Sequence, residues 1–224
     1  MIHRPTLSNT PERLFTPERL VYWYLRVNGF LLLENFIIHP DLGAQQRTDV
    51  DLLGMRFAHR KELLRNPMQD DLLVTECSTL CNVVIAEVKR GECTLNGPWT
   101  NPPDQNMNRI LRAIGCFEEN SIEKAADSLY RSGRYRDENV TCRLFAFGNS
   151  EGILPILGVR QILFSHVIKF IYDRFKKYSQ QKTFVGNWTD DGKNLMDLVK
   201  NSCNFADCER KVRCLFGLRS GDRV

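Results

Sequence analysis

The sequence predicts an α/β protein with a helical segment in its C-terminal part. Two observations support this expectation. Between residues 17 and 148, apolar runs of strand type alternate with segments whose apolar residues recur at helical spacing. Residues 149–224 show mainly helical spacing. At 224 residues the chain can form one domain, with a core at 17–148 and a helical C-terminal extension at 149–224.

The first element is a helix predicted at residues 17–28. Thr16 can cap its first turn, Pro17 suits the first helical position, and Glu18 lies near the positive end of the helix dipole. Apolar side chains follow at helical spacing until Asn28-Gly29 ends the run.

Three strands are predicted next, because residues that favour strands form three runs separated by polar segments. The third run is apolar on both faces, which is typical of a central strand. The connection at 59–81 carries mixed charge, and its sequence does not distinguish short helices from short strands. The predicted strands cover residues 30–39, 48–57 and 82–89.

Two helices are expected after the third strand. Pro102-Pro103 ends an irregular stretch, and Asp104 is predicted to cap the helix that follows. A capping box formed by Asn120 and Glu123 predicts the start of the next helix, which should end at Gly133.

The remaining elements are one strand and the helical C-terminal part. A strand is predicted at 141–147, followed by an amphipathic helix at 159–178. Basic residues lie on its polar face between Lys169 and Lys182. We expect this face to be exposed to solvent, with DNA contact as the alternative. A short helix at 193–200 and a basic tail at 209–224 complete the chain.

Composition restricts the classes of function only weakly. Lys and Arg outnumber Asp and Glu by 31 to 27, which is compatible with a polyanionic partner. The eight cysteines are widely scattered and no apolar signal segment opens the chain, so we expect reduced thiols and a cytoplasmic protein. The apolar run at 30–33 is far shorter than the ~20 residues that span a bilayer, so we expect no membrane partner.

The strongest chemical motif closes the third strand. Side chains alternate between the faces of a strand, so Glu87 and Lys89 project from one face at roughly 7 Å from each other. The preceding strand offers two acids, Asp49 and Asp51. Carboxylates on neighbouring strands with a lysine beside them can hold a metal ion and a water molecule next to a phosphodiester. Oxygen ligands at two protein positions suit Mg²⁺ or Mn²⁺ better than zinc.

The order of these motifs resembles the PD-(D/E)XK nuclease superfamily, and most of all its Holliday-junction resolvase and Mrr-like branches. The resemblance covers residues 17–148 and depends on Glu18, the Asn28-Gly29-Phe30 turn, Asp51 and Glu87-x-Lys89. It implies a restriction-endonuclease-like core with the element order αβββαβ, in which helices flank a mixed central sheet. It also implies a metal-dependent endonuclease that hydrolyses phosphodiester bonds of DNA.

The resemblance further assigns roles to four residues. Asp51 and Glu87 are expected to bind Mg²⁺, for which Mn²⁺ can substitute. Lys89 is expected to orient the attacking water or to help deprotonate it. Glu18 is expected to bind a second ion or to support the first through water, although an acid in a first helical turn is favourable for dipole reasons alone.

The sequence departs from the superfamily pattern in one respect that leaves an alternative open. No proline precedes the strand acid, so Asp49 is an alternative ligand to Asp51; we favour Asp51 because Leu52-Leu53 follows it directly. Gln105 and Arg109 lie in the first turns of the helix after the third strand and are accessory candidates for contacting phosphate, with an ordinary helix surface as the alternative.

A second class of function competes with the nuclease. The same fold could serve as a non-catalytic module that binds nucleic acid or protein. DNA rather than RNA follows only from the resemblance, and the resemblance is compatible with a homodimer. The cysteine spacing lacks the Cys-x2-Cys pairs of structural zinc sites, so a zinc protein is the least favoured alternative.

Overall fold

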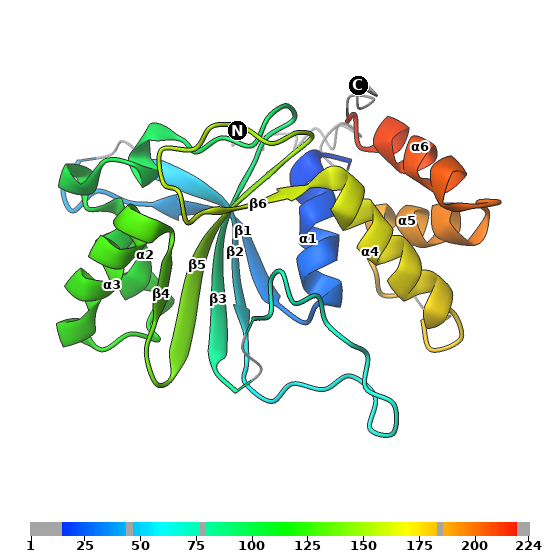
Figure 1. The fold of residues 1–224 in the computed structure, drawn as a ribbon, viewed down its shortest axis with the longest axis horizontal. Coiled ribbons are helices and arrows are strands. Elements are labelled where there is room, and N and C mark those ends of the chain that lie inside the picture. The colour runs from blue at the N-terminus through cyan, green and yellow to red at the C-terminus, as the bar shows by residue number, and fades with distance from the viewer. Residues whose placement is uncertain (1–14, 44–46, 77–78, 183–185, 219–224) are drawn as a thin grey trace, which may run out of the picture.

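The computed structural model describes residues 15–43, 47–76, 79–182 and 186–218, so the last six residues of the basic tail lie outside it. Within these ranges the chain is an α/β protein with six α-helices and an open, mixed six-stranded sheet (Figure 1). The helices are α1 (Pro17–Val27), α2 (Asn106–Ile114), α3 (Glu119–Ser132), α4 (Phe164–Lys177), α5 (Asp190–Lys200) and α6 (Phe205–Leu215). The strands are β1 (Leu31–Ile38), β2 (Thr48–Arg56), β3 (Cys81–Val88), β4 (Arg134–Arg136), β5 (Val140–Gly148) and β6 (Arg160–Leu163).

The sheet combines antiparallel and parallel pairs in the order β1-β2-β3-β5-β4. β1, β2 and β3 are antiparallel neighbours, whereas β3 and β5 run parallel. β4 pairs with the first half of β5, and β6 pairs in parallel with its second half. The predicted order of one helix, three strands, helices and a strand is confirmed, and α1, β1, β2, β3 and β5 lie within two residues of their predicted bounds.

Helices cover both faces of the sheet. Figure 1 shows α2 and α3 on one side and α1 with α4, α5 and α6 on the other. Alternate residues of β3 separate the two cores: Val83 and Ile85 pack with α2 and α3, whereas Val84 and Ala86 pack with α1 and the C-terminal helices. A strand buried on both faces is what the continuous apolar run predicted.

The start and end of α1 follow the predicted signals. The Thr16 hydroxyl accepts a hydrogen bond from the Arg19 N–H at 3.4 Å, and Pro17 and Glu18 occupy the first turn. The helix ends at Val27, and Gly29 then adopts a φ of 86°, a conformation that glycine tolerates without strain.

The helix predicted at 159–178 is wrong at its N-terminal end. Residues 160–163 form β6, and α4 begins only at Phe164. The pairing of β4 with β5 reaches only as far as Arg143, opposite the first residue of β4, so the second half of β5 presents unpaired backbone groups that β6 satisfies. Residues 160–163 form a strand because they pair with β5, which is distant in sequence. Helical spacing alone does not predict such a tertiary contact.

Two predicted helix caps are also wrong. Asp104 lies in the 3₁₀ turn Pro102–Asp104, and the left-handed conformation of Gln105 separates that turn from α2. α3 begins at Glu119, before the predicted cap Asn120. Phe117 packs its ring against Tyr135, which brings the chain into the helix earlier than the capping pattern indicates.

The C-terminal helices attach to α1 through a buried carboxylate. Asp191, at the start of α5, is fully buried and accepts hydrogen bonds from the Trp23 indole at 2.9 Å and from Arg19 at 2.7 Å. Gly192 lies so close to the Trp23 ring that a Cβ atom there would be 2.0 Å from a ring carbon. α5 is therefore held directly against α1. A helix in the predicted tail, α6, adds Cys208 and Val212 to the same core.

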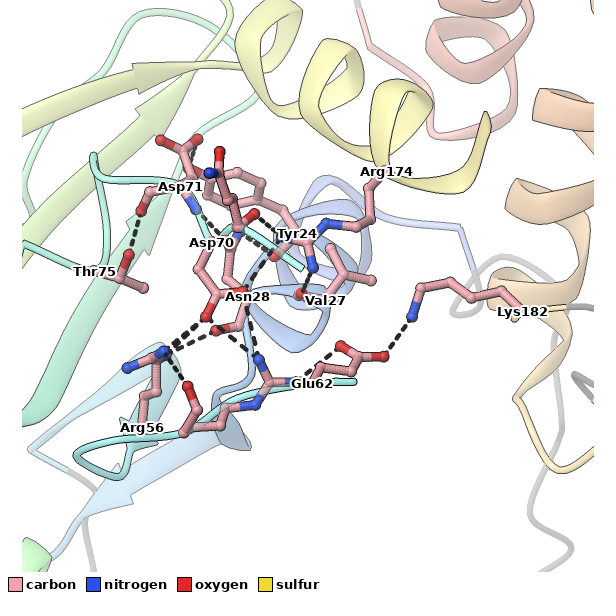
Figure 2. Close-up of polar contacts among 12 residues, drawn as sticks. Tyr24, Val27, Asn28, Arg56, Glu62, Asp70, Asp71, Thr75, Arg174 and Lys182 are labelled. Atoms are coloured by element: carbon pink, nitrogen blue, oxygen red, sulfur yellow. Dashed lines mark hydrogen bonds and ion pairs between the residues drawn. The ribbon is translucent and has the colours of Figure 1, made fainter. Parts of the chain in front are cut away.

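The connection between β2 and β3 is held by a network of buried charges (Figure 2). Asp70 accepts from Arg56 at 2.7 Å and from Arg174 of α4 at 3.3 Å, while Arg174 also donates to the Val27 carbonyl at the end of α1. Asn28 accepts from the Asp71 N–H at 2.7 Å. The β2–β3 connection is thereby bonded to α1, β2 and α4. These contacts define a segment whose structure its mixed charge did not predict.

Neither disulfides nor bilayer-spanning helices are part of the described structure. Its cysteines are free thiols. Among the described residues, none of the helices combines the length and the apolarity needed to cross a lipid bilayer.

Replacing Asp70 tests this network. The side chains of Arg56 and Arg174 are only 4% and 2% exposed, so Asp70→Ala leaves two buried guanidinium groups without their counter-charge. We expect the free energy of unfolding, measured with urea, to fall by about 3–5 kcal/mol. Asp173→Ala removes an exposed ion pair with Lys169 and should cost no more than about 1 kcal/mol. Equal, small losses for both variants would contradict the role of Asp70.

Candidate active site

Asp51 lies at the point where the pairing of β2 with β3 ends. The last pair of the ladder is Leu52 with Ala86, which places Asp51 and Glu87 across from each other at the next position. There the Asp51 carboxylate takes the place of a backbone acceptor, because its Oδ2 accepts from the Val88 N–H at 2.7 Å. This bond fixes the carboxylate beside the end of β3.

The side-chain alternation of β2 breaks at Asp51. Val50 and Leu53 pack into the same core, whereas strict alternation would place them on opposite faces. Opposite this break, Asn35 of β1 has a φ of 49°, a left-handed conformation that asparagine tolerates better than most residues. The pairs on either side of Asn35 and Asp51 keep one register, so the irregularity is local. Asp51 is therefore the residue at which β2 changes face.

Glu87 is a buried charge held by two donors. Its side chain is 1% exposed, and its Oε2 accepts from the Trp99 indole N–H at 2.9 Å. Its Oε1 accepts a short hydrogen bond from the Lys89 ammonium group, whose side chain is 29% exposed. The contact confirms that Glu87 and Lys89 project from the same face. Lys89 thus reaches from solvent to a carboxylate inside the protein.

Burial and like charge perturb both carboxylates. Burial raises the pKa of Asp51 and the charge of Glu87 raises it further, to about 6, against the opposing effects of the Val88 N–H and of Lys89. Burial also raises the pKa of Glu87, although hydrogen bonds from Lys89 and Trp99 oppose the shift. The two acids are therefore close enough to repel each other, in surroundings that do not fully compensate their charge.

Glu18 and Asp49 act on this pair from its periphery. The charge of Glu18, in the first turn of α1, contributes to the raised pKa of Asp51. The charge of Asp49 contributes to the raised pKa of Glu87. Asp49 remains an alternative to Asp51 as a ligand.

The predicted acids do not gather into a three-ligand metal cluster. In the part of the chain that the structure describes, no three His, Cys, Asp or Glu side chains are placed together as metal ligands would be. The structure brings together Asp51, Glu87 and Lys89, and it leaves Glu18 within electrostatic range only.

Gln105 and Arg109 belong to a different surface. Both line a cleft of about 520 Å³ beside β1, whose lining includes none of the three residues Asp51, Glu87 and Lys89. Arg109 forms a two-pronged ion pair with Asp41 at 2.5–2.7 Å. Because Gln105 has a left-handed backbone, it ends a turn instead of standing in the first turn of a helix. Their position does not support the expectation that Gln105 and Arg109 are accessory residues of the carboxylate site.

The basic face of α4 is partly neutralised. Lys169 pairs with Asp173 on the same helix, and Lys182 pairs with Glu62 of the β2–β3 connection. Arg174 points into the protein and is 2% exposed. The expected solvated face therefore carries less free charge than its sequence indicates.

Sequence reasoning missed two residues that shape the site, Trp99 and Asn35. Trp99 comes from the 3₁₀ turn Gly97–Trp99, which is fixed by the Asn106 amide donating to the Pro98 carbonyl at 3.1 Å. A tryptophan in a Gly-Pro-Trp loop carries no signal that identifies its partner. Asn35, by contrast, interrupts an apolar strand run, and a polar residue of that type could have indicated a backbone irregularity.

Comparisons with protein-family models, with curated proteins and with solved structures find no match for this chain. The geometry of its own residues therefore carries the functional argument.

The raised pKa of Asp51 is a direct test of this geometry. Titration of the carboxyl carbons by NMR in metal-free protein should give Asp51 a pKa of about 6, compared with about 3.9 for an unperturbed aspartate. Glu87→Gln removes the neighbouring charge, so we expect the pKa of Asp51 to fall but to stay above 3.9 because burial remains.

The matched control for this titration is Glu123→Gln, which removes an exposed acid from α3 and should leave Asp51 unaffected. An ordinary pKa for Asp51, or no response to Glu87→Gln, would show that the two acids are not neighbours.

Proposed function

We propose that this protein is a metal-dependent nuclease that hydrolyses phosphodiester bonds of DNA. The observation that carries the proposal is the juxtaposition of Asp51, Glu87 and Lys89 where β2 and β3 part. Two carboxylates with a partly exposed ammonium group beside them can hold a divalent ion and an attacking water at a phosphate, and their raised pKa values are of the kind that clusters at functional sites.

The residues present fit a divalent cation. Asp51 uses Oδ2 for the Val88 N–H, which leaves Oδ1 for a ligand bond. The Trp99 indole fixes the orientation of Glu87, as outer hydrogen bonds commonly do for metal-binding carboxylates. The mutual repulsion of the two acids would be relieved by a cation between them. Mg²⁺, with Mn²⁺ as a substitute, suits two carboxylates because it retains several of its waters.

Each residue then has a defined task. Asp51 and Glu87 would hold the ion, which when bound polarises the phosphate and lowers the pKa of an attacking water. Lys89 would exchange its hydrogen bond to Glu87 for one to that water and orient it towards phosphorus. Glu18 and Asp49 would strengthen the negative potential that attracts the cation.

We also propose that the fold is a restriction-endonuclease-like core and that the chain is a member of the PD-(D/E)XK superfamily. The support for a restriction-endonuclease-like core of the PD-(D/E)XK type is the order of one helix, three strands, two helices and further strands, with acids on β2 and β3. The resemblance is the reason for choosing DNA over RNA. The scattered cysteines are the reason for proposing the cytoplasm, and the resemblance is the basis for considering a homodimer.

One observation favours a second candidate, a non-catalytic binding module with the same fold. Both oxygens of Glu87 already accept hydrogen bonds, from Lys89 and from Trp99. If the ion pair with Lys89 is permanent, the charge of Glu87 is neutralised without a metal. Binding of nucleic acid would then be insensitive to chelators.

Cleavage assays separate the two candidates. Purified protein should cut supercoiled, linear or branched DNA with Mg²⁺ or Mn²⁺ and lose this activity with a chelator. Lys89→Ala should lower the cleavage rate by about 100-fold or more, because general acid–base or water-orienting groups commonly contribute that much. Its circular dichroism spectrum should stay the same, since Lys89 is partly exposed.

The same assay decides between the two β2 acids. Asp51→Asn should reduce cleavage as severely as Lys89→Ala, whereas Asp49→Asn should have the smaller effect. Glu123→Gln, on the far helix α3, is the control. Cleavage by Lys89→Ala at the wild-type rate would refute the nuclease, and a larger effect of Asp49→Asn would make Asp49 the ligand.

A further inference from the structure

A basic cleft lies at the edge of the sheet, away from Asp51 and Glu87. It has a volume of about 350 Å³ and is lined by residues of α3, β4 and the start of β5, together with Glu76 of the β2–β3 connection. Its charged lining residues are five cations and one carboxylate: Lys124, Arg131, Arg134, Arg136, Arg143 and Glu76. We refer to it as the edge cleft.

The edge cleft and the carboxylates occupy opposite ends of the sheet. β3 and β5 run parallel, with Cys81 beside Val140 at one end and Val88 beside Phe147 at the other. The edge cleft includes Thr141 and Arg143, near the first of these ends, whereas Glu87 lies near the second. In Figure 1 the turn between β4 and β5 marks the end that carries the cleft. The two sites are therefore separate surfaces.

Part of the positive charge of the edge cleft is uncompensated among the described residues. Lys124, Arg131 and Arg134 form no ion pair with any residue in the described ranges. Glu76 pairs with Arg143 at 3.0 Å, but the Glu76 side chain is 51% exposed and can move aside. Burial and the nearby charges of Arg160 and Arg134, against the opposing charge of Glu76, lower the pKa of Arg143, which shows that the cations are close enough to repel one another.

Charge on an edge strand has a simpler explanation, which covers only part of the cleft. Basic residues on β4, such as Arg134, discourage pairing with the edge strand of another chain. That explanation does not apply to Lys124 and Arg131, which lie on α3, or to Arg143, which is 8% exposed on β5. Arg143 also contacts the Leu73 carbonyl and the Phe145 ring, but the cations of three elements still line one concavity.

We infer that the edge cleft binds clustered phosphate groups. Arginine is the preferred residue for phosphate because its planar guanidinium group can donate two parallel hydrogen bonds. Several cations in one cleft favour a ligand with adjacent phosphates over a single carboxylate or phosphate. Two sources share this chemistry: the backbone of a nucleic acid and a small polyphosphate. A nucleic-acid backbone would deepen the proposed function, because DNA would then contact the protein at both ends of the sheet.

A binding experiment without metal tests the cleft separately from cleavage. Fluorescence anisotropy with a labelled DNA duplex is measured in chelator across a salt series, and calorimetry with inorganic tripolyphosphate supplies the second arm. Arg131→Ala/Arg134→Ala removes two exposed cations from the cleft, and Lys193→Ala/Lys200→Ala removes two from α5 as a matched control. Circular dichroism confirms that both variants are folded.

We expect the cleft variant to weaken duplex binding about tenfold and to reduce the salt slope by about 2, one unit for each lost phosphate contact. The control should change neither quantity by as much. A loss confined to tripolyphosphate would identify a small polyphosphate as the ligand. If neither ligand binds, or both variants lose affinity equally, the inference is wrong. Because no metal is present, these outcomes do not depend on whether Lys89→Ala abolishes cleavage.

Discussion

Two carboxylates, Asp51 and Glu87, are held within electrostatic range of each other where β2 and β3 part, and the surrounding structure compensates only part of their repulsion. Three donors act against it: the Val88 N–H on Asp51, and Lys89 and the Trp99 indole on Glu87. The pKa of both acids is nevertheless raised, chiefly by burial, and in Asp51 also by the charge of Glu87. In the proposed function, a cation bound between the two acids would relieve this unfavourable arrangement.

The rest of the structure fixes the positions of these groups. β3 is buried by helices on both faces, so the end of this strand is a rigid support for Glu87. Trp99 is fixed through the contact of Asn106 with Pro98, which links Glu87 to the start of α2. On the other face, Arg174 of α4 donates to the Val27 carbonyl of α1, and Asp191 of α5 accepts from Trp23 of α1. α1 carries Glu18. Preorganised surroundings of this kind are what a metal-dependent site requires.

Local chemistry in the sequence was sufficient to predict a large part of this arrangement. The Thr16 cap and the Asn28-Gly29 stop defined α1, and the period of two along β3 placed Glu87 and Lys89 on one face. Both signals act over a few residues, so they survive in almost any tertiary context.

The remainder depends on contacts between distant segments. The pairing of β6 with β5, the hydrogen bond from Trp99 to Glu87 and the burial of Arg174 involve partners that no local pattern specifies. The change of face at Asp51 needs the left-handed Asn35 on the neighbouring strand. The edge cleft likewise collects cations from α3, β4 and β5 that are scattered in the sequence.

Paramagnetic broadening by Mn²⁺ tests the central claim most directly. In an NMR titration of the intact protein, substoichiometric Mn²⁺ placed between Asp51 and Glu87 should first broaden the Val88 amide and the Trp99 indole signals, because these N–H groups bond to the two carboxylates. Equivalent Mg²⁺ should shift the same signals without broadening them. Broadening that begins elsewhere, for example around Asp41 in the cleft beside β1, or no selective broadening at all, would contradict a metal site at the parting of β2 and β3.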